Sequence, residues 1–325
     1  RSFTQDVNTF AFNGKFEGQF EFADRIFGWD AGYTYAENDQ QDITNGLFNV
    51  LALRQALGPS MIVNGQPICV ATPNDPATRI AGCVPLNLLG ANGSITPDML
   101  AFSSFVAQDA LGFEMLNYFA NIGGDLFELP GGMAQFGAGL ERRDESGFDQ
   151  PDALIASGNT TGNARTPTVG GFTVDEAYVE FLLPVVSDLP FAQQLDIRLA
   201  SRYSDYSTVG ETTNSAAGFS WKPIDDLLIR GNFAEGFRAP SIGELFSGVA
   251  DSFPQVADPC NNARIGSLSA TARARCAAQG VPAAGYDQGN PQIRVSVGGN
   301  PFLQPETSES RTLGFVYSPG FLEGF

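Results

Sequence analysis

Phe10-Ala11-Phe12-Asn13-Gly14-Lys15-Phe16-Glu17-Gly18-Gln19-Phe20-Glu21-Phe22 is the stretch of sequence that decides the fold. Every even position carries Phe or Gly, and every odd position from 13 onwards carries a polar or charged side chain. Side chains alternate between the two faces of a β-strand, so this stretch predicts a strand with one apolar and one polar face. An alternation of this length exceeds the five or six residues of a common soluble strand and favours a tilted strand that crosses a membrane.

The same alternation recurs in eight further runs along the chain. Each run places apolar side chains at every second position and mostly polar side chains or glycine between them. The runs extend over Trp29 to Tyr35, Leu116 to Leu126, Ala134 to Leu140, Ala177 to Leu183, Leu195 to Leu199, Ala217 to Trp221, Leu227 to Phe233 and Leu313 to Tyr317. We therefore expect nine antiparallel strands, the first of which turns its Phe side chains towards lipid.

The connections between these runs differ in length in a regular way. Short connections are expected at 23–27, 128–132, 184–192 and 223–226, and they alternate with long ones at 38–112, 145–172 and 239–304; only 207–212 breaks the order. Outer-membrane barrels have short turns on the periplasmic side and long loops outside the cell. The sequence therefore predicts an all-β fold, an antiparallel transmembrane β-barrel with long extracellular loops. Short helices are expected in those loops at 45–57, 96–106 and 269–280.

The composition argues against several classes of function. Asp and Glu number 36 against 18 Lys and Arg, and the net charge of −18 argues against binding to nucleic acid, whose phosphates require basic partners. No run approaches the roughly 20 apolar residues of a membrane helix. The absence of His removes His-based catalytic triads, HExxH zinc sites and haem ligation by His. Asp39 and Asp42 suggest Ca²⁺ binding but lack the spacing of an EF-hand loop. We expect no enzyme, no cofactor and no metal site.

Four cysteines form two close pairs, Cys69 with Cys83 and Cys260 with Cys276. Neither pair has CxxC spacing, and no His is present to complete a mixed zinc site. Local disulfides are the simplest interpretation, and they indicate an oxidising compartment. Each would close a loop of about fifteen residues, which stabilises a fold by on the order of 3 kcal/mol in the chain-entropy model. Both pairs lie in long connections and are therefore predicted on the extracellular side.

Three segments resemble TonB-dependent outer-membrane receptors. Gly124-Asp125-Leu126-Phe127-Glu128-Leu129-Pro130-Gly131-Gly132 is similar to a recurring periplasmic hairpin of that family. Gly236-Phe237-Arg238-Ala239-Pro240-Ser241-Ile242-Gly243-Glu244-Leu245-Phe246 resembles a barrel motif of the family, and Gly299-Asn300-Pro301-Phe302-Leu303-Gln304-Pro305-Glu306-Thr307-Ser308 resembles the partner motif that opens the next strand. A structural role is expected for Gly236, Phe237, Arg238, Ala239, Pro240, Ser241, Glu244, Leu245, Asn300, Pro301, Pro305 and Glu306. Arg238 and Glu244 are expected in the wall and against a plug rather than on a ligand.

The resemblance implies a barrel of about 22 strands, filled by an N-terminal plug domain. A short TonB box would contact the energy-transducing protein TonB. The chain starts at Arg1 without an initiating Met, a plug or a TonB box, so residues 1–325 are expected to be a barrel segment of about nine strands. The implied function is active import of a scarce nutrient: a siderophore, cobalamin or an oligosaccharide. The alternative is a passive outer-membrane pore or a secreted all-β adhesin. The ligand is expected on the loops at 38–112 and 239–304.

Overall fold

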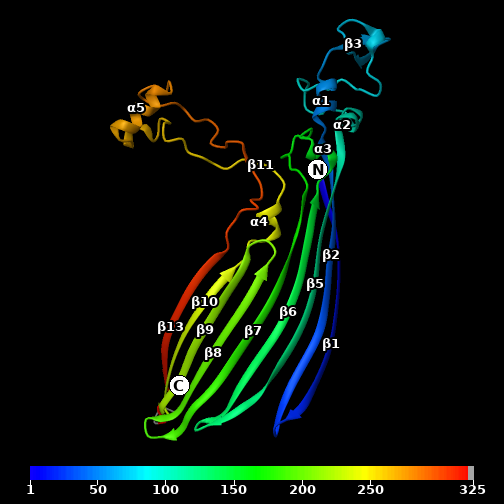
Figure 1. The fold of residues 1–325 in the computed structure, drawn as a ribbon. Helices are drawn as coiled ribbons and strands as arrows, with labels where there is room; N and C mark the ends of the chain where they lie inside the picture. Colours follow the sequence, from blue (N-terminus) through cyan, green and yellow to red (C-terminus); the bar gives the residue numbers. More distant parts are fainter. Residues whose placement is uncertain (321–325) are drawn as a thin grey trace.

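Nine antiparallel strands form the main sheet of the computed structural model, which describes residues 1–320, and each strand pairs with the next one along the sheet (Figure 1). The strands are β1 (Ser2–Phe22), β2 (Arg25–Phe48), β5 (Ser104–Leu129), β6 (Gly132–Gln150), β7 (Thr168–Leu189), β8 (Ala192–Tyr206), β9 (Gly210–Ile224), β10 (Leu227–Arg238) and β13 (Glu306–Tyr317). Each alternating run of the sequence lies within one of them. The prediction of an all-β, antiparallel fold is confirmed. Within residues 1–320 the sheet is open, with β1 and β13 as its edges.

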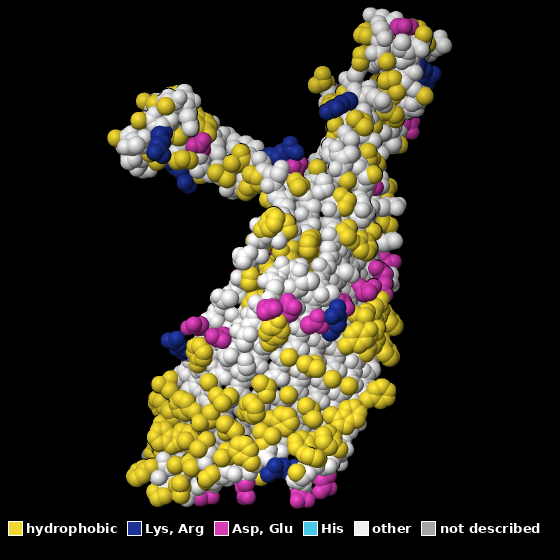
Figure 2. Space-filling view, in the orientation of Figure 1, with side chains coloured by type: hydrophobic (Ala, Val, Ile, Leu, Met, Phe, Trp, Pro, Cys, Tyr) yellow, Lys and Arg dark blue, Asp and Glu magenta, His cyan; other side chains and the backbone are white. Residues whose placement is uncertain are grey.

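The strand register carries one apolar face across the whole sheet. Phe16 pairs with Ala31, Ala31 with Ala120, Ala120 with Leu140, and Leu140 with Ala177. Directly opposed residues project to the same face of a sheet, so the alternation of each strand is in phase with that of its neighbours. Figure 2 shows the result as a broad hydrophobic band around the half of the sheet that carries the short turns. We call this face the apolar face.

Charged side chains border the apolar band on the side of the long loops. The register places the following residues on the apolar face, beyond the band: Glu37, Glu114, Arg142, Asp144, Asp175, Asp205, Glu211, Glu235, Glu309 and Arg311. Arg142 and Asp175 are paired at 2.9 Å. Figure 2 shows acidic and basic side chains gathered along this border. The apolar surface therefore ends at a defined level of the sheet.

The opposite face is polar at the same level. Lys15 Nζ lies 2.6 Å from Glu17 and 4.0 Å from Asp30. Farther across the sheet, the Tyr178 hydroxyl donates to Asn121 Oδ1 at 2.9 Å. Lys15, Glu17 and Glu21 thus lie on the face opposite to the Phe side chains of β1, as their parity predicts. The sheet therefore has one apolar and one polar face.

The strands are longer and the short turns tighter than the sequence predicts. β2 continues to Phe48 and β5 begins at Ser104, although 38–112 was expected to be a loop. Beyond the apolar band, residues 38–42 of β2 place polar side chains on both faces, so the alternation disappears while the backbone ladder continues. The first turn consists of Ala23 and Asp24, whose φ values of 52° and 57° are those of a type I′ hairpin turn. Its flanking Arg25 already belongs to β2.

The remaining elements lie in three long loops at one end of the sheet, where the only short connection is the turn at 207–209 between β8 and β9. They are α1 (Val50–Ala56), β3 (Ser60–Val63), β4 (Gln66–Cys69), η1 (Pro76–Thr78), α2 (Pro97–Ser103), α3 (Ala153–Ala156), α4 (Ile242–Phe246), β11 (Ala250–Ser252), η2 (Ile265–Ser267), α5 (Ala270–Ala278) and β12 (Val295–Val297). The three expected helices are α1, α2 and α5. The helix expected at 96–106 ends at Ser103, because Phe105 and Val106 already belong to β5. Among the described helices, none has the length and hydropathy needed to cross a bilayer.

Two arms project from the sheet, one at residues 49–103 (the first arm) and one at 250–297 (the second arm), and they diverge (Figure 1). The Cys69–Cys83 disulfide lies in the first arm and packs with Ala56, which is 2% exposed. The Cys260–Cys276 disulfide lies in the second arm and packs against Ile265. Each arm therefore has a small core of its own, built around its disulfide.

Candidate functional site

The two sequence motifs meet at the end of the sheet that carries the long loops. β10 ends at Arg238 and β13 begins at Glu306, and these two residues are register partners. The Arg238 guanidinium donates to Glu306 Oε1 at 2.5 Å and to both carboxylate oxygens of Glu244 at 3.0 Å. We call Arg238, Glu244 and Glu306 the latch, because one arginine joins the two motifs.

Glu244 is held in the latch by the N-terminal cap of α4. The sequence Ser-x-x-Glu forms a capping box: the Glu244 backbone N–H donates to Ser241 Oγ at 3.3 Å, and the Ser241 backbone N–H donates to Glu244 Oε2 at 2.8 Å. The hydrogen bonds from Arg238, followed by those from Ser241, lower the pKa of Glu244 to about 2. The carboxylate is therefore ionised at neutral pH, and the latch is an ion pair.

The second motif closes onto α4 through its backbone. The Asn300 N–H donates to the Glu244 carbonyl at 2.8 Å, and the Gly299 N–H donates to the Ser247 carbonyl at 2.8 Å. A Cβ at Gly299 would lie 2.6 Å from the Leu245 carbonyl oxygen, so only glycine permits this approach. Leu245 is 2% exposed beneath the contact. The two motifs thus form one packed unit.

A row of aromatic rings starts next to the latch and connects it to neighbouring strands of the sheet. The ring centroids of Phe237 and Tyr206 are 5.6 Å apart, and those of Tyr206 and Phe172 are 6.0 Å apart. The ring of Phe246 from α4 packs on Gly170 of β7, where a Cβ would overlap it. These contacts bring α4 across to β7, so the loop after β10 covers strands that are distant from it in the sheet.

A cavity of about 680 Å³ lies between this aromatic row and α4. Its charged lining includes Arg143, whose Nε lies 2.8 Å from Glu145 Oε1, and Asp149. The volume is in the range of pockets that bind small molecules. Apolar rings together with charged groups can hold a ligand. The arrangement is suited to binding.

The loop at 151–167, here called the bridging loop, is pinned to the sheet by Arg165. Its guanidinium donates to Asp109 Oδ2 of β5 at 2.6 Å and to Asp149 Oδ2 of β6 at 2.7 Å. Asp109 Oδ1 also accepts the backbone N–H of Asp152 at 2.7 Å. This cluster was not predicted from the sequence, because no motif or spacing links Arg165 to a carboxylate 56 residues away.

The bridging loop touches the bases of both arms. At the first arm, Val50 N–H donates to the Asn159 carbonyl at 2.9 Å. At the second arm, Asp251 N–H donates to the Ala164 carbonyl at 2.8 Å, and Thr166 N–H donates to the Val249 carbonyl at 2.9 Å. One loop therefore connects the two arms to each other and, through Arg165, to the sheet.

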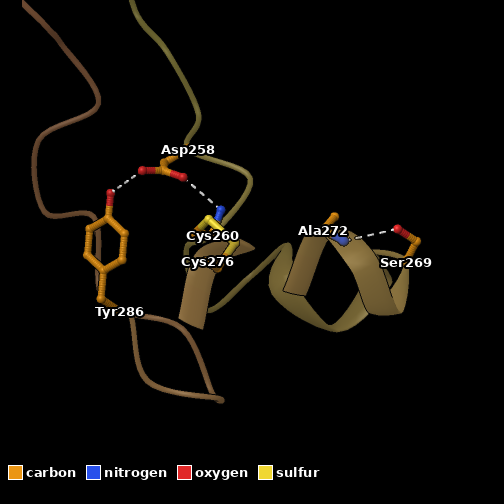
Figure 3. Close-up of a disulfide and its surroundings, with 6 residues drawn as sticks. All are labelled: Asp258, Cys260, Ser269, Ala272, Cys276 and Tyr286. Atoms are coloured by element: carbon orange, nitrogen blue, oxygen red, sulfur yellow. Dashed lines mark hydrogen bonds between the residues drawn. A yellow bond between two sulfur atoms is a disulfide. The ribbon is translucent and has the colours of Figure 1, made fainter. Parts of the chain in front are cut away.

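The disulfide region of the second arm, residues 253–292, is here called the knob (Figure 3). The Asp258 carboxylate accepts the Cys260 backbone N–H at 2.7 Å and the Tyr286 hydroxyl at 2.8 Å. These two hydrogen bonds, the backbone one first, lower the pKa of Asp258. Ser269 caps α5 by accepting the Ala272 N–H at 3.2 Å. The knob is thus ordered by one carboxylate, one helix cap and one disulfide.

The remaining predicted residues have less specific surroundings. Gly236 faces Ser308, and Ala239 and Pro240 line the cavity. Pro301 and Pro305 lie in the connection to β13. Within residues 1–320, no three His, Cys, Asp or Glu side chains are grouped as a metal site would require.

A family model described as "TonB dependent receptor-like, beta-barrel" matches residues 1–324. A search of the curated proteins finds no match. Among solved structures, the chain is similar to the siderophore receptor PirA from Acinetobacter baumannii, with 11% sequence identity and a TM-score of 0.39 over 98% of this chain. The chain spans 52% of that receptor chain. This likeness is too distant to transfer a property of that receptor.

Proposed function

The chain belongs to the family of TonB-dependent receptor β-barrels, and on that premise we propose that it forms part of the wall of an outer-membrane receptor that imports a scarce nutrient. Import would be coupled to the proton gradient through TonB. We propose a role in transport rather than in catalysis, and the cavity of aromatic rings and charged groups would serve to hold the ligand. A siderophore, cobalamin and an oligosaccharide are the candidate ligands.

The observation that carries this proposal is the apolar face that the register extends over all nine strands. A soluble sheet buries its apolar face in a core, yet Phe16 is 78% exposed and Leu313 is 79% exposed, at opposite edges of the sheet. A lipid bilayer solvates such a band, and the charged border marks the level at which headgroups begin. The short turns would then face the periplasm and the arms the cell exterior.

The open edges and the polar face of the sheet support the proposal that further strands and a plug domain complete the receptor. Unpaired backbone groups are not tolerated in lipid, so β1 and β13 require further strands that close the barrel, up to the about 22 strands of transporters of this type. A barrel of that size leaks unless its lumen is filled. The polar face with Lys15 and Asp30 would meet a plug domain, and movement of the plug by TonB would open the path.

Ligand capture would begin at the arms and continue at the cavity below the latch. The arms project farthest from the sheet on the loop side (Figure 1), and the cavity is lined by Arg143 and Asp149 of the polar face together with the segment that leads from β10 to the second arm. The bridging loop joins both arms to the sheet through Arg165, so a ligand that contacts an arm acts on an element attached to the wall. The disulfides suit an exterior location, where thiols are oxidised.

Uptake by intact cells tests the proposal. Cells that express the full gene are offered labelled ferric siderophores, cyanocobalamin or oligosaccharides, with and without a protonophore. We expect one ligand class to accumulate, and the protonophore should stop accumulation while surface binding continues. Accumulation that is insensitive to the protonophore would indicate a passive pore. Surface binding without any accumulation would indicate an adhesin.

A further inference from the structure

Three arginines lie in or beside the cavity next to α4, and each of them has two carboxylates within 4.0 Å. The three groups are Arg143 with Glu141 and Glu145, Arg165 with Asp109 and Asp149, and Arg238 with Glu244 and Glu306. Each group has one positive and two negative charges, so the formal net charge of the three together is −3. Four of these side chains line the cavity directly: Arg143, Glu145, Asp149 and Arg238. The electrostatic field in the cavity is therefore negative.

Three aromatic rings line the same cavity. The ring centroid of Tyr206 lies 6.0 Å from that of Phe172 and 5.6 Å from that of Phe237, and all three side chains are half-buried. Within residues 1–320, the rings that an arginine covers are those of Tyr178 and Phe233, which lie outside this row. The face of an aromatic ring carries a negative partial charge and attracts a cation within about 6 Å of its centroid. The rings and the carboxylates therefore favour the same sign of charge in a ligand.

The helix α4 partly shields the cavity from water. Ile242 Cδ1 of α4 lies 3.9 Å from the position that a Cβ would take at Gly147, and the Phe246 ring packs on Gly170. Gly147 and Gly170 are register partners, and Gly147 lies on the same face of β6 as Arg143, four residues before it. The helix therefore lies across the polar face of β6 and β7. The attraction of a cation to a ring or a carboxylate is stronger where water is excluded.

We propose that this cavity binds an organic cation, whose positive charge lies against the rings of Phe172, Tyr206 and Phe237 and next to Glu145, so that the imported nutrient is positively charged. This inference rests on the proposed function and specifies its ligand class. An anion would meet carboxylates that outnumber the arginines two to one. An uncharged ligand of the same shape would pack on the rings without the attraction to these carboxylates. A cation gains from both features of the cavity.

Calorimetry on the purified full-length receptor in an uncharged detergent tests this inference without an energised membrane. The probes are choline, 3,3-dimethylbutan-1-ol and 3,3-dimethylbutanoate, which share one branched shape and are positive, uncharged and negative. We expect choline to bind about tenfold more tightly than the alcohol, and the carboxylate not to bind. The inference is overturned if choline does not bind at millimolar concentration, or if the alcohol or the carboxylate binds as tightly as choline. Either result would leave active import, which the uptake experiment tests separately, unaffected.

Two matched pairs of variants assign the binding to this cavity. Y206L removes one aromatic face but keeps an apolar side chain, and it should weaken choline binding about fivefold. Y203L makes the same change three residues away on the apolar face and should leave binding unchanged. E145Q removes a carboxylate of the cavity and should weaken choline binding about threefold, most clearly at low salt. E114Q removes the same charge from the apolar face and should have no effect. Equal losses in both Tyr variants, or wild-type affinity in both Y206L and E145Q, would also overturn the inference.

Discussion

Arg165 donates a hydrogen bond of 2.6 Å to Asp109, although the two residues belong to a loop and to a strand that are 56 residues apart. The Asp109 side chain is only 11% exposed, so the loss of this partner would leave a largely buried carboxylate without its ion pair. The same guanidinium binds Asp149. Since the bridging loop also contacts both arms, the ion pair of Arg165 and Asp109 connects the two arms to the strands of the sheet.

Replacing Arg165 with Gln should release the bridging loop. The variant leaves Asp109 without its charged donor, which should cost about 2 kcal/mol of local stability. Hydrogen exchange followed by mass spectrometry should show faster exchange at the N–H groups of Asp251 and Thr166, whose bonds join the loop to the second arm. Exchange within the central strands should not change.

R54Q is the control for this experiment, because Arg54 is exposed on the first arm and makes no ion pair among the described residues. If hydrogen exchange rises equally in both variants, the loss of one positive charge, rather than the loss of the Arg165 contacts, would explain the faster exchange of the bridging loop. Unchanged exchange in Arg165→Gln would mean that the backbone contacts hold the loop without it.

The strands of the sheet can be predicted from the sequence where their two faces differ in polarity. Along β1 from Phe10 to Phe22 the environments on the two sides are apolar and polar, so hydropathy reports the side-chain period directly. The same strand continues in the ladder back to Ser2, and around the pair of Gln5 with Asp42 polar side chains such as Thr4, Gln5 and Asp6 occupy both faces. No hydropathy signal marks that part. Strand existence and order were therefore predictable, whereas strand ends were not.

The candidate site likewise contains some contacts that the sequence predicts and others that it does not. Arg238, Ser241 and Glu244 lie close in the sequence, and the Ser-x-x-Glu spacing has a local physical meaning as a helix cap. The bond from Arg238 to Glu306 crosses 68 residues and was not predicted, because the resemblance identified the two segments only as partner motifs. Arg165 has neither a local pattern nor a motif. Its contacts depend on which residues of β5 and β6 lie side by side, and a hydropathy pattern does not specify that register.

The latch should lose stability in acid over a defined range. The pKa of Glu244 is lowered from 4.5 to about 2, so its ionised form stabilises the folded state above pH 4.5. This contribution disappears as the pH falls from 4.5 towards 2. The lowered pKa of Glu306, caused by Arg238, acts in the same direction. Pepsin should therefore cleave at Leu245 and Phe246 increasingly as the pH decreases.

Cleavage rates are divided by those of a peptide of residues 239–250 in the same buffers, which removes the pH dependence of pepsin itself. E244Q should already be cleaved readily at pH 4.5 and should show a flatter profile. A wild-type profile as flat as that of E244Q would contradict the assigned role of Glu244.

Reduction should loosen the arms and leave the sheet intact. Each disulfide spans 14 or 16 residues, and its loss should cost on the order of 3 kcal/mol within its own arm. Mass mapping of non-reduced peptides should give Cys69 with Cys83 and Cys260 with Cys276. After reduction, protease sites should open within 49–103 and 250–297, while the strands stay protected. Cross-linked peptides between the two arms, or free thiols in protein from intact membranes, would exclude this pairing.

Phe16 offers the most direct test of the surface on which the functional proposal depends. Its side chain is 78% exposed and lies on the apolar face, in register with Ala31. If this face meets lipid, F16R buries a charge in hydrocarbon and should cost roughly 2–4 kcal/mol near the bilayer midplane. Urea titration of the full receptor folded into lipid vesicles measures the difference. Q19R, three residues away on the polar face, is the matched control and should cost little. An equal loss of unfolding free energy in F16R and Q19R would show that the two faces of the sheet lie in the same environment. The assignment of the apolar face to a membrane would then be wrong.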